Sequence, residues 1–319
     1  MNNLKKIGLT ALAGTLAATT ANAGTLSVGG TADIVYQTHG DGSATGNPFS
    51  QTQTLSFSGS GDLDNGMAVN YSSSFTGTAF TASSVAIDMG DAGTIGLYSN
   101  LSDGGGISAY QDVIPTAGEQ VWDDTGSTHG GTANGITDMG SRANLAYNNS
   151  FGDITFSADW ARSAEGAEGS VVVVYDNLID GLSLGYGVGE TQEAANTTVS
   201  TDLETLFVKY TTGPVTLGAQ RSVVTPAVSN GTSAATSEKT RDHIGASFAI
   251  NENLSVSAGR SDLDFGSGST LRDQTDSGVS ASYTMGSTTI GFVHNKTADE
   301  AGVLNADYDV TEVSLTFAF

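Results

Sequence analysis

Apolar and polar residues alternate in short runs along most of this chain. In segment 182–189, Leu, Tyr and Val hold every second position, with Ser or Gly between them. A similar period of two recurs at 67–72, 154–160 and 279–285. Successive side chains of a strand point to opposite faces, so each run predicts a strand with one apolar face. No amphipathic helix longer than two turns is visible.

Two kinds of connection separate the runs, and they alternate strictly along the chain. Tight turn signals rich in Gly, Asn and Asp predict hairpins at 64–66, 90–93, 152–153, 180–181, 212–214, 251–253 and 286–287. Longer polar connections lie near 38–50, 76–80, 101–139, 164–168, 191–201, 226–238, 264–274 and 297–306. Between them we predict sixteen strands, at 25–37, 51–61, 67–75, 81–89, 94–100, 140–150, 154–163, 169–178, 182–190, 202–211, 215–225, 239–250, 254–263, 275–285, 288–296 and 307–319.

An even number of antiparallel strands with short turns at one end and long loops at the other is typical of an outer-membrane barrel. Lipid cannot hydrogen-bond to the backbone, so a sheet that spans a membrane must close on itself. We therefore predict an all-β fold, a 16-stranded antiparallel transmembrane β-barrel that forms one domain over residues 24–319. Its apolar faces point to lipid, including the face formed by Val313, Leu315, Phe317 and Phe319 at the end of the chain.

The first 23 residues have the features of a secretory signal peptide. Lys5 and Lys6 precede an apolar stretch at 7–18, and Ala21-Asn22-Ala23 fits the cleavage pattern. Removing this segment makes the net charge of −23 more negative still. Such acidity argues against a nucleic-acid partner. The chain has no Cys, which excludes disulfides and thiolate metal sites.

Several segments resemble the Gram-negative general porin family, especially its alphaproteobacterial members. They are SFSGSGDLDNGMAVNYS, DAGTIGLYSN and FGDITFSADW, together with the signal peptide and the terminal Phe. The resemblance implies a homotrimer of barrels in the outer membrane that passes small hydrophilic solutes and contacts lipid and lipopolysaccharide. It also implies that Phe317 and Phe319 form a signal for the barrel-assembly machinery.

In this family the third long loop folds into the lumen and narrows it, and segment 101–139 matches that loop in position and length. The carboxylates that we expect at the constriction are Asp103, Asp112, Glu119, Asp123 and Asp124. Family members usually set such a loop against basic residues on the facing wall. Here no Lys or Arg occurs between residues 24 and 141. We therefore predict a preference for cations.

The alternation of each strand predicts which charged side chains face the lumen. Asp33, Arg142, Lys209 and Arg241 fall on the polar faces of their strands. Arg260 shares the apolar face of its strand, but Leu263 and Phe265 have the opposite parity. A bulge near Gly259 would turn Arg260 into the lumen. The same conflict at Arg221 has no such solution, and its orientation stays open.

Other functions are weighed against a diffusion pore. A sugar-selective channel needs an aromatic track, for which Trp122 and Tyr110 are too few, and a Gly-rich adhesin needs neither sixteen strands nor a terminal Phe. The four His show no metal-site or Ser-His spacing, so we expect no enzyme and no cofactor. Asp262 with Asp264, or Asp123 with Asp124, offers a place for a divalent cation, although solvated charge is favoured.

Overall fold

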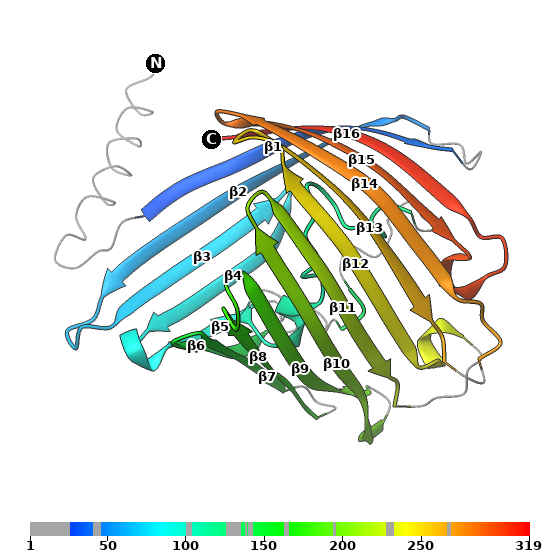
Figure 1. The fold of residues 1–319 in the computed structure, drawn as a ribbon. Coiled ribbons are helices and arrows are strands. Elements are labelled where there is room, and N and C mark those ends of the chain that lie inside the picture. The colour runs from blue at the N-terminus through cyan, green and yellow to red at the C-terminus, as the bar shows by residue number, and fades with distance from the viewer. Residues whose placement is uncertain are drawn as a thin grey trace.

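In the computed structural model the chain forms a closed barrel of sixteen antiparallel strands (Figure 1). The structure describes residues 26–40, 46–99, 104–125, 135–137, 139, 143–162, 166–193, 196–227, 233–266 and 269–319. The predicted signal peptide, Asp103 and Arg142 lie outside this part of the chain. The strands are β1 (Leu26–His39), β2 (Phe49–Asp62), β3 (Ala68–Thr76), β4 (Ala79–Asp88), β5 (Thr94–Tyr98), β6 (Asn144–Phe151), β7 (Ile154–Arg162), β8 (Ala167–Asp176), β9 (Leu182–Glu193), β10 (Asn196–Thr212), β11 (Val215–Thr225), β12 (Lys239–Ala249), β13 (Leu254–Asp264), β14 (Gln274–Met285), β15 (Thr288–Ala298) and β16 (Tyr308–Ala318).

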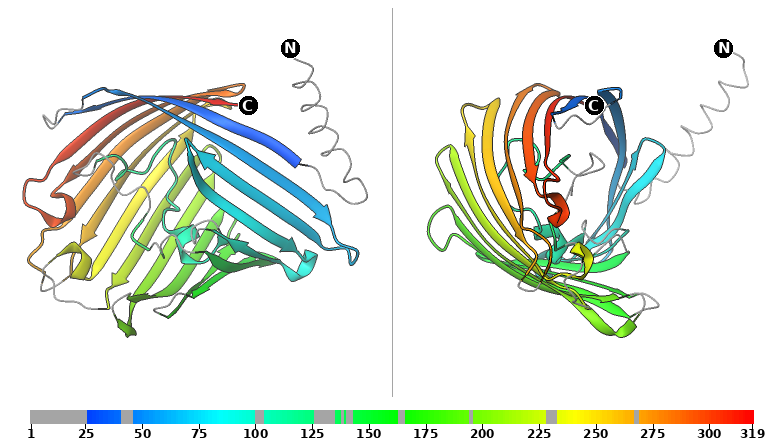
Figure 2. Two further views of the ribbon diagram at one scale, coloured as in Figure 1. Left: turned by 180° about the vertical axis from the view of Figure 1, so that it is seen from behind. Right: turned by 90° about the vertical axis from the view of Figure 1, so that its right-hand side faces the viewer.

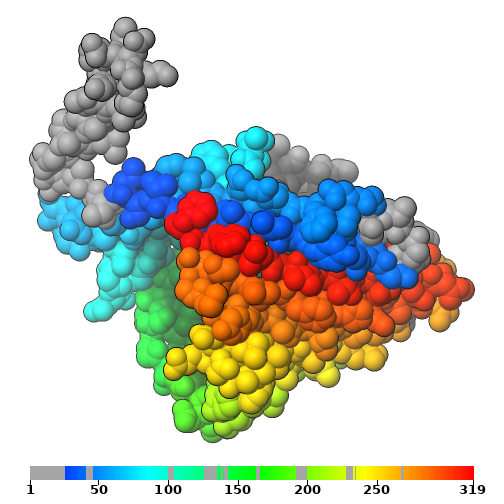
Figure 3. Space-filling view, turned by 90° about the horizontal axis from the view of Figure 1, so that it is seen from above, coloured from blue at the N-terminus to red at the C-terminus, as the bar shows by residue number. Residues whose placement is uncertain are grey.

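Every strand pairs with its neighbours in sequence, and β1 closes the barrel by pairing with β16. In this last pair Thr31 lies opposite Ala318 and His39 opposite Val310. The closed wall is visible end-on in the right-hand view of Figure 2, and the space-filling view in Figure 3 shows the first and last strands side by side. Short 3-10 turns are the only helical elements assigned in the described chain, and no helix there is long and apolar enough to span a membrane.

The exposure of the strand residues is the reverse of that in a water-soluble protein. Large apolar side chains lie on the outer face of the barrel, where Trp160 is 50% exposed and Leu97 is 58% exposed. Between them, small and polar side chains such as Ser157 and Thr205 point inward and are buried. This arrangement is expected when lipid surrounds the barrel and water fills it.

The predicted strands are confirmed, mostly with shifts of one or two residues at each end. Two connections differ from the prediction. The polar segment 76–80 is a tight turn, because Gly77 adopts φ +60° and β4 begins at Ala79. Most of the predicted loop 191–201 is strand, since β9 continues to Glu193 and β10 begins at Asn196. Alternation is weak where Thr and Ser dominate, and there the sequence resembles a loop.

The backbone of Phe319 takes part in barrel closure. Its N–H donates to the carbonyl of Gly30 at 3.0 Å, and the N–H of Gly30 donates to the carbonyl of Phe319 at 2.8 Å. The phenyl ring lies over Gly30, where a Cβ would stand 3.2 Å from ring carbon Cε2. The residue therefore contributes both a pair of backbone hydrogen bonds and an exposed aromatic ring.

Deleting Phe319 should reduce the amount of barrel inserted in the outer membrane, because deletion removes both the hydrogen bonds and the ring. Phe319→Ser keeps the backbone pair and removes only the ring. If the ring is an assembly signal, both variants insert poorly while synthesis and export continue. Phe151→Ser is the matched control, since Phe151 is another exposed phenylalanine next to a tight turn. Insertion is measured as heat-modifiable protein in membrane fractions. Equal insertion of Phe319→Ser and Phe151→Ser would contradict the assembly role.

Candidate pore constriction

Residues 104–125, between β5 and β6, lie against the inner wall of the barrel. Their backbone is held by inward-facing side chains from successive strands. The N–H of Ile107 donates to Ser170 Oγ of β8 at 2.7 Å. The N–H of Ala117 donates to Ser257 Oγ of β13 at 2.9 Å. Asn295 of β15 donates to the carbonyl of Gln120 at 2.8 Å. The described part of the predicted constriction loop, residues 104–125, therefore crosses the wall from β7 toward β15.

Glycines on the inner face of the wall make room for this loop. A Cβ at Gly245 would stand 2.6 Å from Cγ2 of Ile114, and one at Gly218 would stand 2.5 Å from Cδ of Pro115. At Gly259 the nearest atom, Cγ1 of Val121, would lie at 3.1 Å. These glycines occupy neighbouring positions on β11, β12 and β13. Larger residues there would displace the loop from the wall.

Three carboxylates meet where the loop approaches β16. One oxygen atom each from Glu119, Asp124 and Glu312 lies within 4.8 Å of the others. Glu312 faces inward from β16 and accepts a hydrogen bond from Gln37 Nε2 of β1 at 3.3 Å. Two predicted loop carboxylates thus join a wall residue that our sequence reasoning did not select. The inward parity of Glu312 between Val313 and Thr311 was the available signal.

The other described loop carboxylates lie close to this group. Burial raises the pKa of Asp123 to about 7. The backbone N–H of Gln120, which donates to Asp123 Oδ2 at 2.8 Å, acts in the opposite direction and lowers this pKa. Burial, then the charges of Glu312, Asp124 and Asp123, raises the pKa of Glu119 to about 9. Burial also raises the pKa of Asp112. These carboxyl groups therefore keep their protons to a higher pH than free carboxyl groups do.

The wall formed by β1 to β5 carries mainly hydroxyl groups on its inner face. Ser72 and Ser84 are hydrogen-bonded at 2.7 Å, and Thr54 and Thr76 at 3.2 Å. A hollow of ≈ 590 Å³ lies here and is lined by uncharged side chains, mostly Ser with Tyr71. A second hollow, of about 610 Å³ and elsewhere on the barrel, differs in having carboxylates in its lining. Asp33 faces inward from β1, as predicted, and accepts a long contact of 3.5 Å from Thr31. This side of the lumen offers polar but largely uncharged surface.

Arg241 faces inward as its parity predicts, yet the loop covers it. The side chain is 4% exposed, and its guanidinium carbon lies 4.4 Å from the centre of the Trp122 ring. Nη1 lies 3.3 Å from Oδ2 of Asp276, which is fully buried on β14. Lys209 also faces inward, but it sits near the tight-turn end of β10. The predicted basic pore wall is therefore weaker than parity alone indicates.

The predicted lumen position of Arg260 is wrong. The pairing of β12 with β13 is regular through Gly259, and Arg260 lies opposite outward-facing Ile244 without a bulge. Its guanidinium binds Asp262 on the outer face, with Nη2 2.7 Å from Oδ1. The prediction failed because Leu263 and Phe265 are apolar for another reason. Both are buried inside the barrel, where Phe265 packs near Gly302 of an extracellular loop.

Arg221 also faces outward, which answers the question that its sequence left open. Nη2 lies 2.6 Å from Oδ2 of Asp242 on the neighbouring strand. Asp262 thus belongs to this outer surface, where its carboxylate accepts hydrogen bonds from Arg260 and Thr275. These charges lie in the long-loop halves of their strands, where Arg221 is opposite outward-facing Leu206 and Arg260 is opposite Ile244. Each of the two arginines is paired with an aspartate on the same outer face.

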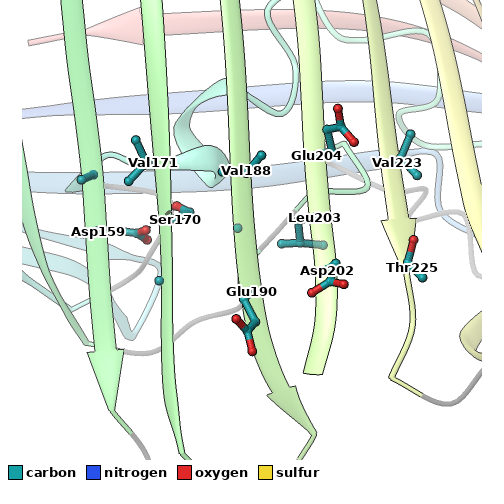
Figure 4. A pocket seen from close by; sticks show the side chains of 13 residues that line it. Asp159, Ser170, Val171, Val188, Glu190, Asp202, Leu203, Glu204, Val223 and Thr225 are labelled. Atoms are coloured by element: carbon teal, nitrogen blue, oxygen red, sulfur yellow. Dashed lines mark hydrogen bonds between the residues drawn. The ribbon is translucent and has the colours of Figure 1, made fainter. Parts of the chain in front are cut away.

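A shallow hollow of ≈ 610 Å³ lies on the outer face of the barrel across β7 to β11. Figure 4 shows Val171, Val188 and Val223 on one side of it and Glu190 and Asp202 on the other. The valines belong to the apolar outer face, and the carboxylates lie toward the long-loop ends of β9 and β10. Glu204 of β10 lies between Val188 and Val223 in the valine row, so this part of the outer face mixes apolar and acidic side chains (Figure 4).

The sequence profile of the family described as Gram-negative porin matches residues 8–293. The chain belongs to this family. Family membership and the sixteen-strand barrel make the protein an integral outer-membrane protein, and Gram-negative porins are channels. No curated protein sequence matches the chain significantly.

Solved porin structures have the same fold despite low sequence identity. A porin structure refined at 1.8 Å resolution superposes with a TM-score of 0.67 at 17% identity, covering 92% of this chain and 100% of that one. The anion-selective porin from Comamonas acidovorans gives a TM-score of 0.63 at 16% identity over 93% and 100%. The outer membrane protein OmpT of Vibrio cholerae, described in its trimer form, gives 0.67 at 10% over 93% and 100%.

Proposed function

We propose that this porin is a water-filled channel for passive diffusion of small hydrophilic solutes and ions, and that it prefers cations. The observation that carries the preference is the meeting of Glu119, Asp124 and Glu312 beside the loop. Arg241, a basic side chain in contact with this loop, is buried and paired with Asp276. Negative potential therefore dominates the narrow part of the lumen and concentrates cations there.

The carboxylate group also supports a dwell site for a permeating cation. Oxygen atoms within 4.8 Å of one another suit a hard cation such as Ca²⁺ or a hydrated monovalent ion. Such a site slows an ion only briefly if conduction is to continue. We expect no cofactor and no catalysis for this function.

A sugar-selective channel is the second candidate, and the aromatic residues of the loop argue against it. Trp122 is 2% exposed, so its ring offers no face to a solute. Tyr110 stacks on Phe207 with ring centres 5.7 Å apart. A saturating block of ion current by a sugar would favour this candidate over simple diffusion.

The proposed assembly is a homotrimer in contact with outer-membrane lipid and lipopolysaccharide, inserted by the barrel-assembly machinery. The trimer form described for the Vibrio cholerae protein supports the oligomer. The exposed apolar side chains of the outer face, such as Leu97 and Trp160, support the lipid contact. No nucleic acid is expected as a partner of so acidic a chain.

The proposed function predicts a cation-selective reversal potential for the wild-type protein in a planar bilayer across a KCl gradient near pH 10, above the raised pKa values of Glu119 and Asp123. The effect should be largest at low ionic strength, because the screening length shrinks from about 30 Å at 0.01 M to about 10 Å at 0.1 M salt. A zero or anion-selective potential at low salt would overturn the cation preference. Absence of any channel activity would overturn the pore itself.

A further inference from the structure

Arg241 is the most deeply buried charged side chain in contact with the constriction loop. It lies on β12, 4% exposed, with Trp122 of the loop on one side and Asp276 of β14 on another. Its Nη1 also donates to Ser261 Oγ of β13 at 3.2 Å. Arginine suits this place because its planar guanidinium can stack on an aromatic ring and bind a carboxylate at once.

The contacts of Asp276 lead back to the same part of the loop. Thr297 of β15 donates to Asp276 Oδ1 at 2.5 Å, and Gln274 donates to it at 2.9 Å. The hydroxyl of Thr297 lies 2.6 Å from that of Thr125. The hydroxyl oxygen of Thr125 also lies 3.1 Å from the carbonyl oxygen of Trp122, and its single proton is given either to that carbonyl or to Thr297. Arg241 therefore contacts the loop at Trp122 and Thr297 contacts it at Thr125, while Asp276 binds both Arg241 and Thr297.

Asp123 and Asp124 lie between Trp122 and Thr125 in the sequence. Asn295 donates to the backbone carbonyl of Asp123 at 3.3 Å, so the backbone there is held to the wall. Asp124 has φ +60°, a left-handed conformation that a non-glycine residue keeps only when its surroundings hold it. The carboxylate group of Glu119, Asp124 and Glu312 depends on this geometry.

We propose that Arg241 is a positioning residue, which sets the width and the charge of the constriction by holding the loop through Trp122 rather than by lining the pore. The inference rests on the proposed pore function and concerns how that same site is held. The Arg241–Asp276 pair is internally neutral, so a permeating ion meets little of its field. Loss of one partner would leave a buried charge unpaired, which is strongly unfavourable.

This role and a pore-lining role predict opposite changes in selectivity. Neutralising a cation that lines the pore raises the preference for K⁺ over Cl⁻ and leaves conductance almost unchanged. Releasing the loop moves Asp123 and Asp124 from the constriction, so the preference for K⁺ falls and conductance rises. The rest of the barrel still limits the current, so the rise should be roughly twofold at most.

The test uses the double variant Arg241→Met/Asp276→Asn, which keeps the net charge and leaves no buried charge unpaired. We expect higher single-channel conductance and a reversal potential closer to zero than in the wild type. Trp122→Leu should reproduce both changes. Combining it with the double variant should add little, because both act on one contact. Arg241→Lys keeps the charge near Asp276 and should restore much of the wild-type behaviour.

The matched control is Arg221→Met/Asp242→Asn, which removes an ion pair of the same type from the outer wall and should leave conductance unchanged. A barrel of normal heat-modifiability is required for each comparison, and Trp122→Leu serves if the double variant does not fold. Increased K⁺ preference at unchanged conductance would overturn the positioning role while leaving the pore intact. A wild-type protein without channel activity would overturn the proposed function instead.

Discussion

Changing Glu119, Asp123 and Asp124 to their amides should bring the selectivity of the channel close to that of free KCl. A unit charge about 10 Å from an ion in water contributes about 0.4 kcal/mol, favourable for a cation and unfavourable for an anion. Three ionised carboxylates, after screening, would shift the cation-to-anion permeability ratio about 15-fold at 0.01 M salt. At 0.1 M the same reasoning leaves about a fourfold shift.

The measurement is reversal potential across a KCl gradient near pH 10, above the raised pKa values of Glu119 and Asp123. The control changes Asp64, Asp91 and Asp153 to Asn, which alters the net charge equally but only in the tight turns. We expect the control to keep most of the wild-type selectivity. A triple amide variant as cation-selective as the wild type would show that the selectivity arises elsewhere along the lumen.

Raising the pH from about 6 to about 10 should increase the cation selectivity of the wild-type channel. Burial raises the pKa of Asp123 to about 7 and that of Glu119 to about 9. A raised carboxyl pKa means that the group is neutral below that value and negative above it. Negative charge therefore appears at the constriction as the pH rises, first at Asp123 and then at Glu119.

The charged groups that face these two residues explain why the titration should be broad. Glu119 faces Asp123 and Asp124 of the loop and Glu312 of β16. Asp123 faces Asp112 and Asp124, and Arg241 of β12 acts in the opposite direction. Interacting carboxyl groups titrate together rather than one by one.

Reversal potential measured at several pH values tests this titration, and the triple amide variant is its control. The wild type should become steadily more cation-selective over the range, whereas the variant should show a nearly flat profile. A wild-type profile as flat as that of the variant would mean that the three carboxylates stay ionised, or neutral, at every pH tested.

Strand order and facing could be predicted because period-two alternation is a local property. Leu184 and Tyr186 lie outside the barrel simply because lipid surrounds it, and Glu312 lies inside for the converse reason. The argument fails where apolar residues face something other than lipid. Leu263 is apolar but lies inside the barrel, so its parity predicted the wrong face for Arg260.

The burial of Arg241 could not be predicted, although its inward direction could. Parity tells which face of the wall carries a side chain, and it says nothing about what covers that face. The covering residue, Trp122, belongs to a loop without periodicity and meets Arg241 only through tertiary folding. The glycines at 218, 245 and 259 were visible in the sequence, but their common role depends on strand register.

The pairing of β1 with β16 has a consequence for the order of events during synthesis and export. β1 is made first, yet one of its two hydrogen-bonding partners is made last. Until β16 arrives, β1 presents an open strand edge, which readily pairs with other chains and aggregates. The chain therefore cannot complete its sheet before both of these strands are available. Its slowest folding step should be a single late encounter between the two ends of the chain, because contacts so distant in sequence form slowly.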